Sequence, residues 1–256
     1  MILASHGIIG SSIGQFDADA VAFFNRVTTA GGSLSTTEKT AVNTLVLQMK
    51  ADGIWTKMKA IYPMVGASAA ACSQNLKSSS FTGTFTATGW TFASTGVTPN
   101  GTSAYMSTGM NPSTNLSINS AHLSVYIRNT PNNGVLFSNG AFSCYLHPVS
   151  PLLYGGLSNT TTINNNASPV NSFLMINRPS STTVNLFRAN TKLTESTSNN
   201  GTSYTTTIID LARYGSSFYS NGQFAFASIG DGLTDTEASD FYTAVQAFQT
   251  TLSRNI

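Results

Sequence analysis

The stretch His122-Leu-Ser-Val-Tyr-Ile-Arg128 alternates polar and apolar side chains, with Leu123, Val125 and Ile127 on one side. Successive side chains of a β-strand point to opposite faces, so this alternation predicts a strand with one apolar face. Short runs rich in Phe, Tyr, Val, Ile and Thr, separated by Gly, Asn, Pro and Ser clusters, continue from about Gly66 to Gly230. Asn-Gly pairs supply turns between several of them. The region therefore predicts an antiparallel sandwich of two sheets.

Residues 16–66 show a helical pattern instead. Asp17 can cap a helix that ends at Gly31-Gly32. A second helix begins at Ser35, which forms an S-x-x-E capping box with Glu38, and ends at Gly53. A short turn of helix is expected to carry Trp55, Met58 and Ile61 up to Pro63.

The chain closes with an acidic stretch followed by helical spacing. Thr234 and Glu237 form a second capping box, and one apolar face follows, made of Phe241, Val245, Phe248 and Leu252. The acidic side chains near Thr234 favour the positive end of the helix dipole, so they indicate a helix start rather than a metal site. An EF-hand is excluded because Thr236 stands where that loop needs Gly. We predict a helix over 235–254 that closes a β-sandwich domain spanning 67–256.

Composition excludes several functional classes. Only 9% of the 256 residues are charged, the net charge is +2, and the basic residues are scattered, so nucleic-acid binding is not expected. The sequence has no apolar run of the length that crosses a bilayer, so membrane insertion is not expected. No cofactor motif is present. Cys72 and Cys144 are expected to be buried free thiols; a disulfide between them is the alternative.

Candidate catalytic groups are few. Glycoside hydrolysis normally uses two positioned carboxyl groups, and between Ala67 and Gly230 the chain offers only Glu195, in an apparent turn, and Asp210, beside Arg213. The histidines at 6, 122 and 147 lack metal-ligand spacing, and no G-x-S-x-G motif occurs. We therefore expect no catalytic residues, no metal site and no enzymatic activity.

Carbohydrate binding is the more plausible site chemistry. Sugar sites in sandwich proteins combine aromatic faces with amide and hydroxyl groups. The candidates are Trp90, Tyr105, Tyr126 and Tyr154, beside a predicted polar loop, Gly156–Pro169. The alternative for each aromatic residue is a place in the core or in a cross-strand pair.

Three segments carry a resemblance to a known family. They are Gly53–Lys77, Thr98–Tyr126 and Phe226–Leu252, and together they resemble a family of tailed-bacteriophage and prophage virion proteins. The resemblance runs from about Phe16 to the C-terminus. It implies a concanavalin A-like (laminin G-like) jelly-roll body, flanked by N-terminal helices and a C-terminal helix. The family pattern brings no catalytic residues with it.

The resemblance implies a structural virion component, displayed on the head or tail of the particle as a capsid decoration, head fibre or tail-associated protein. Its expected partners are other virion proteins and copies of itself. The alternative is a carbohydrate-binding adhesin that contacts host surface glycans, and a weaker alternative is a glycan-degrading enzyme. Residues 1–15 are expected to be an attachment arm, because their apolar side chains have no periodic partners within the arm; these are Ile2, Leu3, Ile8, Ile9 and Ile13.

Overall fold

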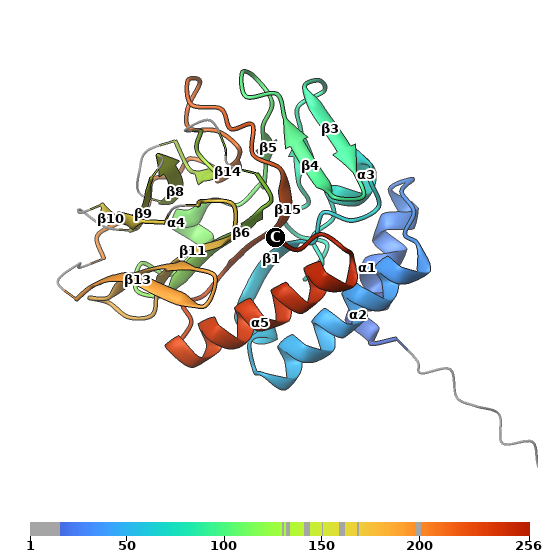
Figure 1. The fold of residues 1–256 in the computed structure, drawn as a ribbon, viewed down its shortest axis with the longest axis horizontal. Coiled ribbons are helices and arrows are strands. Elements are labelled where there is room, and N and C mark those ends of the chain that lie inside the picture. The colour runs from blue at the N-terminus through green and yellow to red at the C-terminus, as the bar shows by residue number, and fades with distance from the viewer. Residues whose placement is uncertain are drawn as a thin grey trace, which may run out of the picture.

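The computed structural model describes residues 16–129, 131, 134–140, 144–149, 151–158, 162–167, 169–197 and 201–256. The predicted arm and its isoleucines and leucine lie outside the described residues. The chain forms two antiparallel β-sheets and a layer of helices (Figure 1). Within the described residues, no helix is both long enough and apolar enough to cross a membrane.

Sheet A has the strand order β13-β12-β11-β6-β15-β4-β3, and β1 also pairs with β15. The predicted strand at His122 lies at its centre as β6. The bounds are β1 Met58–Tyr62, β3 Trp90–Ala93, β4 Gly96–Pro99, β6 Ala121–Ile127, β11 Phe173–Arg178, β12 Val184–Arg188, β13 Thr191–Ser196 and β15 Phe224–Gly230.

Sheet B has the order β10-β9-β8-β7-β14-β5-β2 and faces sheet A across the core. Its bounds are β2 Thr84–Phe85, β5 Met106–Ser107, β7 Phe137–Ser138, β8 Cys144–Val149, β9 Leu152–Leu157, β10 Ile163–Asn166 and β14 Asp210–Leu211. The short helices α3 (Ala69–Cys72) and α4 (Pro112–Asn115) belong to the connections. The predicted fold class, a mainly β two-sheet sandwich with helices before and after it, is confirmed.

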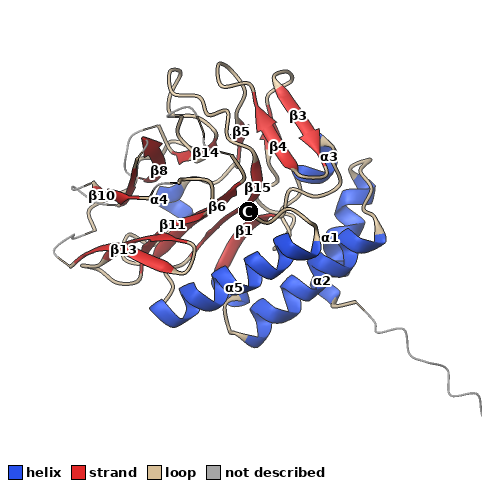
Figure 2. Cartoon of the chain, in the orientation of Figure 1, coloured by secondary structure: helices blue, strands red, loops and turns tan. Residues whose placement is uncertain are grey.

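The central strands of sheet A, β6, β11 and β15, are buried on both faces. One face packs on sheet B, and the other packs on α1 (Ala18–Thr29), α2 (Thr36–Ala51) and α5 (Asp235–Thr251). Figure 2 shows these three helices gathered on one side of the strands. All seven residues of β6 are consequently buried, including its polar side chains. In the described part of the chain, the outer face of sheet B carries no such helical layer.

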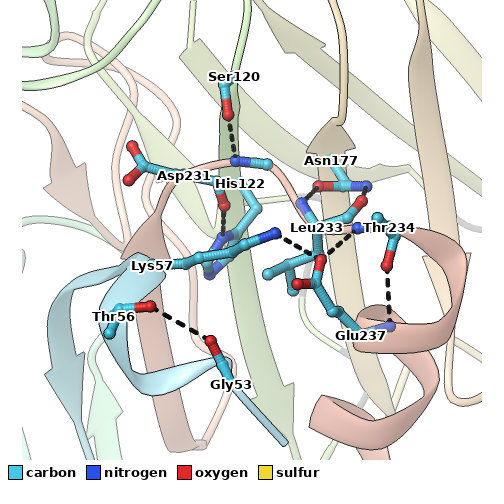
Figure 3. A network of polar contacts seen from close by, with 11 residues as sticks. Gly53, Thr56, Lys57, Ser120, His122, Asn177, Asp231, Leu233, Thr234 and Glu237 are labelled. Carbon is cyan, nitrogen blue, oxygen red and sulfur yellow. Dashed lines mark hydrogen bonds and ion pairs between the residues drawn. The ribbon is translucent and has the colours of Figure 1, made fainter.

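The start of α5 is fixed by the acidic residues singled out in the sequence (Figure 3). The Thr234–Glu237 capping box is present, as is the one between Ser35 and Glu38. Glu237 also pairs with Lys57 at 2.6 Å, between Oε2 and Nζ. Two further ion pairs, Asp231 with Lys59 and Asp235 with Lys192, tie the same turn to β1 and β13. The helix-start interpretation is confirmed.

Several local expectations need correction. The expected short helix is a 3-10 turn over Trp55–Lys57, and Met58–Tyr62 is strand β1, so the segment 16–66 contributes one strand to sheet A. Glu195 lies in β13 rather than in a turn, and α5 ends at Thr251, three residues before the predicted end at 254. Arg254 is fully buried and donates to the carbonyl oxygens of Pro63, Met64 and Ala225.

Cys72 and Cys144 are both buried free thiols, as expected. Burial raises the pKa of both. A high thiol pKa keeps the reactive thiolate form rare, so both cysteines act as small apolar core residues.

Candidate glycan-binding cleft

The strand register identifies which side chains of sheet B face outward. Leu146 of β8, Leu153 of β9 and Ile163 of β10 belong to the core between the sheets. Because side chains alternate along a strand, their neighbours point away from that core. Tyr154 is directly opposite His147 on β8 and Asn164 on β10, so these three side chains share the outer face.

These side chains line one cleft of about 490 Å³, with walls formed by Tyr145, His147, Val149, Tyr154, Thr162 and Asn164. Tyr145 is almost fully buried, and its hydroxyl donates to Oγ1 of Thr162. Burial raises the pKa of Tyr145, so the hydroxyl keeps its proton and stays a donor. The ring surface that the cleft offers therefore comes from the half-buried Tyr154 and His147, beside the exposed residues Thr162 and Asn164.

The floor of the cleft is held by close packing of the two sheets. Gly155 of β9 lies over Ile176 of β11, and a Cβ atom built on Gly155 would come within 2.8 Å of the Ile176 side chain. A larger residue at this position would therefore have to displace the Ile176 side chain. The close approach fixes the strand that carries Tyr154.

An ion pair, Asp210 with Arg213, lies further along the same face of sheet B. Asp210 of β14 pairs with Arg213, 2.7 Å between Oδ2 and Nε, and the Arg213 guanidinium lies 3.2 Å from the centre of the Tyr105 ring. Burial raises the pKa of Asp210, and the hydrogen bond from Arg213 offsets part of that rise. The charge on Arg213 is thus balanced locally.

The aromatic residues predicted from sequence fall in different places. Tyr154 lines the cleft, and Tyr105 lies beside β5 with Arg213 covering one ring face. Trp90 packs edge-on against Phe85 near the opposite end of the sheets, 4.8 Å between ring centres, and donates from Nε1 to Oγ1 of Thr86. Tyr126 is 1% exposed in the core under the helices, where its hydroxyl accepts a hydrogen bond from the Ile256 amide, so it cannot stack on a surface ligand.

Sequence reasoning missed Tyr145 and His147, and it described Gly156–Pro169 as a loop although β10 lies within it. The signal was present in the alternation of Cys144–Val149, where Tyr145 and His147 stand two residues apart and so share one face of the strand. This alternation alone does not say which face is outside. Tyr145 and His147 can be placed on the outer face only when Cys144 and Leu146 are known to face the core.

A larger hollow of about 620 Å³ lies elsewhere, where the start of α2 meets the end of α5. Its walls are mostly hydroxyl side chains, and its one carboxylate, on Glu38, accepts hydrogen bonds from the backbone amides of Ser35 and Gly66. It contains no aromatic side chain, so it is less suited to stacking on a sugar than the cleft on sheet B. No cluster of metal-ligating side chains occurs among the described residues.

Comparisons with known proteins bear on the fold. No protein-family model and no curated protein sequence matches the chain. Domain 4 of AbnA, a GH43 extracellular arabinanase from Geobacillus stearothermophilus solved in complex with arabinotriose, superimposes with a TM-score of 0.53 at 13% identity, over 72% of this chain and 98% of that domain. The botulinum neurotoxin serotype D binding domain gives 0.51 at 10% identity, over 75% of this chain and 52% of that chain. At such identities the likeness shows the architecture, so the chain shares the β-sandwich fold of these two binding domains.

Proposed function

We propose that this chain is a glycan-binding β-sandwich module and that its site is the cleft formed by β8, β9 and β10. The observation that carries the proposal is the convergence of the half-buried rings of His147 and Tyr154 with the exposed Thr162 and Asn164 in one open cleft. Aromatic rings stack on the apolar faces of sugars, while hydroxyl and amide groups orient the sugar hydroxyls. The fold shared with a domain solved in complex with arabinotriose also supports glycan binding.

Of the functions expected from the sequence, this geometry favours the carbohydrate-binding adhesin over a purely structural part. The resemblance to virion proteins supplies the setting, and we propose that the module is displayed on a bacteriophage head or tail, beside other virion proteins and copies of itself. Detection of the chain by mass spectrometry in gradient-purified particles tests this setting. Recovery only in the fractions free of particles would contradict it.

We also propose that the module does not cleave its ligand. Asp210 is engaged by Arg213, and Glu195 pairs with Lys192 on sheet A, so the two carboxyl groups noted in the sequence belong to different sheets. Glycoside hydrolysis needs two carboxyl groups that face one scissile bond. The arrangement supports binding without hydrolysis.

A glycan array tests the binding proposal. Wild-type protein is expected to bind a restricted set of glycans, and Tyr154→Ala is expected to weaken that binding about tenfold, or about 1.4 kcal/mol. Leu47→Ala is the matched control, because Leu47 is 49% exposed on α2, far from sheet B in the layer order. Equal binding by the wild-type protein and Tyr154→Ala would contradict the assignment of the cleft.

A further inference from the structure

An exposed aromatic side chain, Phe218, lies beside the wall of the cleft. Phe218 is 50% exposed, an unusual position for so large an apolar ring. Its ring centre lies 6.3 Å from that of His147 and 6.0 Å from that of Tyr214. Phe218 therefore links the wall of the cleft to the turn that carries Arg213 and Tyr214.

That turn presents a rigid polar group. The Arg213 guanidinium is held by Asp210, by a hydrogen bond with the Tyr219 side chain, and on one face by the Tyr105 ring. A guanidinium held in this way is already ordered, so it loses little further conformational freedom when a ligand binds. Its remaining N–H groups are therefore pre-organised donors. Like the cleft, the turn combines an exposed aromatic ring with fixed polar groups, so it has the chemistry of a second sugar subsite.

The register gives the separation of the two parts. Asp210 is opposite Ser138 on β7, Ser138 is opposite Tyr145 on β8, and Tyr145 is opposite Gly156 on β9. β14 and β9 are thus three strand spacings apart, or ~14 Å at the usual ~4.8 Å between neighbours, and the Phe218 ring lies between them, beside His147 of β8. This span is longer than one sugar ring, so a single ligand that uses both parts must be an oligomer.

The charges define the class of oligomer. Asp210 and Arg213 neutralise one another at 2.7 Å, and the side chains that line the cleft include no Asp, Glu, Lys or Arg. A uronic acid polymer or a sulfated chain would meet no unbalanced cation here. A neutral polysaccharide needs no unpaired cation, because its hydroxyls can form hydrogen bonds with the aromatic hydroxyl, amide and guanidinium groups.

We propose that the site accepts an extended, neutral polysaccharide, with one subsite in the cleft at Tyr154 and a second at Phe218 and Arg213. This inference rests on the proposed function and specifies its ligand. The chain would cross the strands of sheet B from β10 towards β14, and Phe218 would form the side of the second subsite nearest the cleft.

Affinity electrophoresis in gels that contain one soluble polymer each provides the first test. The neutral probes are arabinan, galactan and xyloglucan, and the acidic probes are polygalacturonate and hyaluronate. A neutral polymer is expected to retard the protein, with unchanged retardation when NaCl is raised from about 50 mM to about 500 mM, because screening weakens only charge-dependent binding. Stronger retardation by an acidic polymer, or loss of retardation in salt, would overturn the inference.

Calorimetry with oligosaccharides cut from the retarding polymer tests the second subsite. Wild-type affinity is expected to rise about tenfold or more from the disaccharide to the hexasaccharide. Phe218→Ala should abolish that rise and leave the disaccharide affinity unchanged, Tyr154→Ala should weaken both lengths, and Leu47→Ala should change neither. A flat length dependence in the wild-type protein, or an unchanged rise in Phe218→Ala, would refute the second subsite and leave the proposed function standing. The absence of binding to any probe on the gels and on the array would instead refute both.

Discussion

Protonation of one buried histidine should set the acid stability of the domain. The ring of His122 is fully buried beneath α5, and its Nδ1 lies 2.7 Å from the carbonyl oxygen of Asp231 (Figure 3). Its Nε2 lies 3.1 Å from Oγ of Ser228. A carbonyl oxygen only accepts, so Nδ1 carries the hydrogen and Nε2 accepts from Ser228, which also contacts Ser124. The neutral ring is therefore fully hydrogen-bonded, and a charged ring would be buried with no counter-ion in contact.

The magnitude follows from the pKa of this ring. Burial lowers the pKa of His122 from its ordinary 6.5 to about 4. Between those values the unfolded chain binds a proton that the folded chain does not, so the free energy of unfolding falls as the pH falls. The loss is absent above pH 6.5 and reaches roughly 3 kcal/mol below pH 4; between pH 7.5 and pH 5.0 it amounts to about 2 kcal/mol.

Urea unfolding followed by tryptophan fluorescence at pH 7.5 and pH 5.0 measures this loss, since Trp55 is buried in the helical layer. The comparison is His122→Gln, whose amide stays uncharged at both values of pH. The variant should be less stable than wild type at pH 7.5, yet its free energy of unfolding should change between the two pH values by about 2 kcal/mol less. An identical pH dependence in both proteins would refute the assignment of the buried neutral ring.

Further changes probe the packing, the ends of the chain and the chemistry. Phe241→Ala should lower the free energy of unfolding by about 3–5 kcal/mol in urea melts, because this buried ring packs on other rings of sheet A; a loss below about 1 kcal/mol would show that α5 is dispensable. Arg254→Met should cost about 3 kcal/mol, since it removes the guanidinium donor from the carbonyl oxygens of Pro63 and Met64 and leaves Ala225 only the Gln249 amide; a melting temperature equal to wild type would contradict this. A variant that begins at Phe16 should keep the wild-type melting temperature yet fail to join the particle or to oligomerise, whereas normal incorporation would exclude residues 1–15 as the anchor. Reducing-sugar assays on a polysaccharide panel should show no release, and release that disappears in Asp210→Asn or Glu195→Gln would overturn the non-enzymatic proposal.

Local sequence patterns predict those structural features, such as helix caps and strands, that depend on residues close together in the chain. Ser35 with Glu38, and Thr234 with Glu237, form capping boxes because donors and acceptors three residues apart meet at any helix start. The alternation around His122 likewise predicts a strand. Its polar face is nevertheless buried, because α5, more than a hundred residues further along the chain, packs over it.

Contacts between distant segments account for most of what the sequence did not predict. Met58–Tyr62 has apolar spacing that suits a helix, yet it pairs with β15 about 170 residues later and becomes a strand. The same reasoning explains the site. Tyr126 and Tyr154 look alike in sequence, and only the layer that covers each strand separates a core residue from a cleft residue.

Nuclear magnetic resonance mapping tests the central claim, that the outer face of sheet B binds glycans. Isotope-labelled protein of 27.0 kDa would be titrated with a neutral hexasaccharide cut from the polymer that retards it most. We expect the amide shifts that move most to belong to β8, β9 and β10 and to the turn at Phe218, with the helical layer around Leu47 unaffected. Shifts concentrated on α1, α2 or α5, or in the hollow between α2 and the end of α5, would contradict the claim.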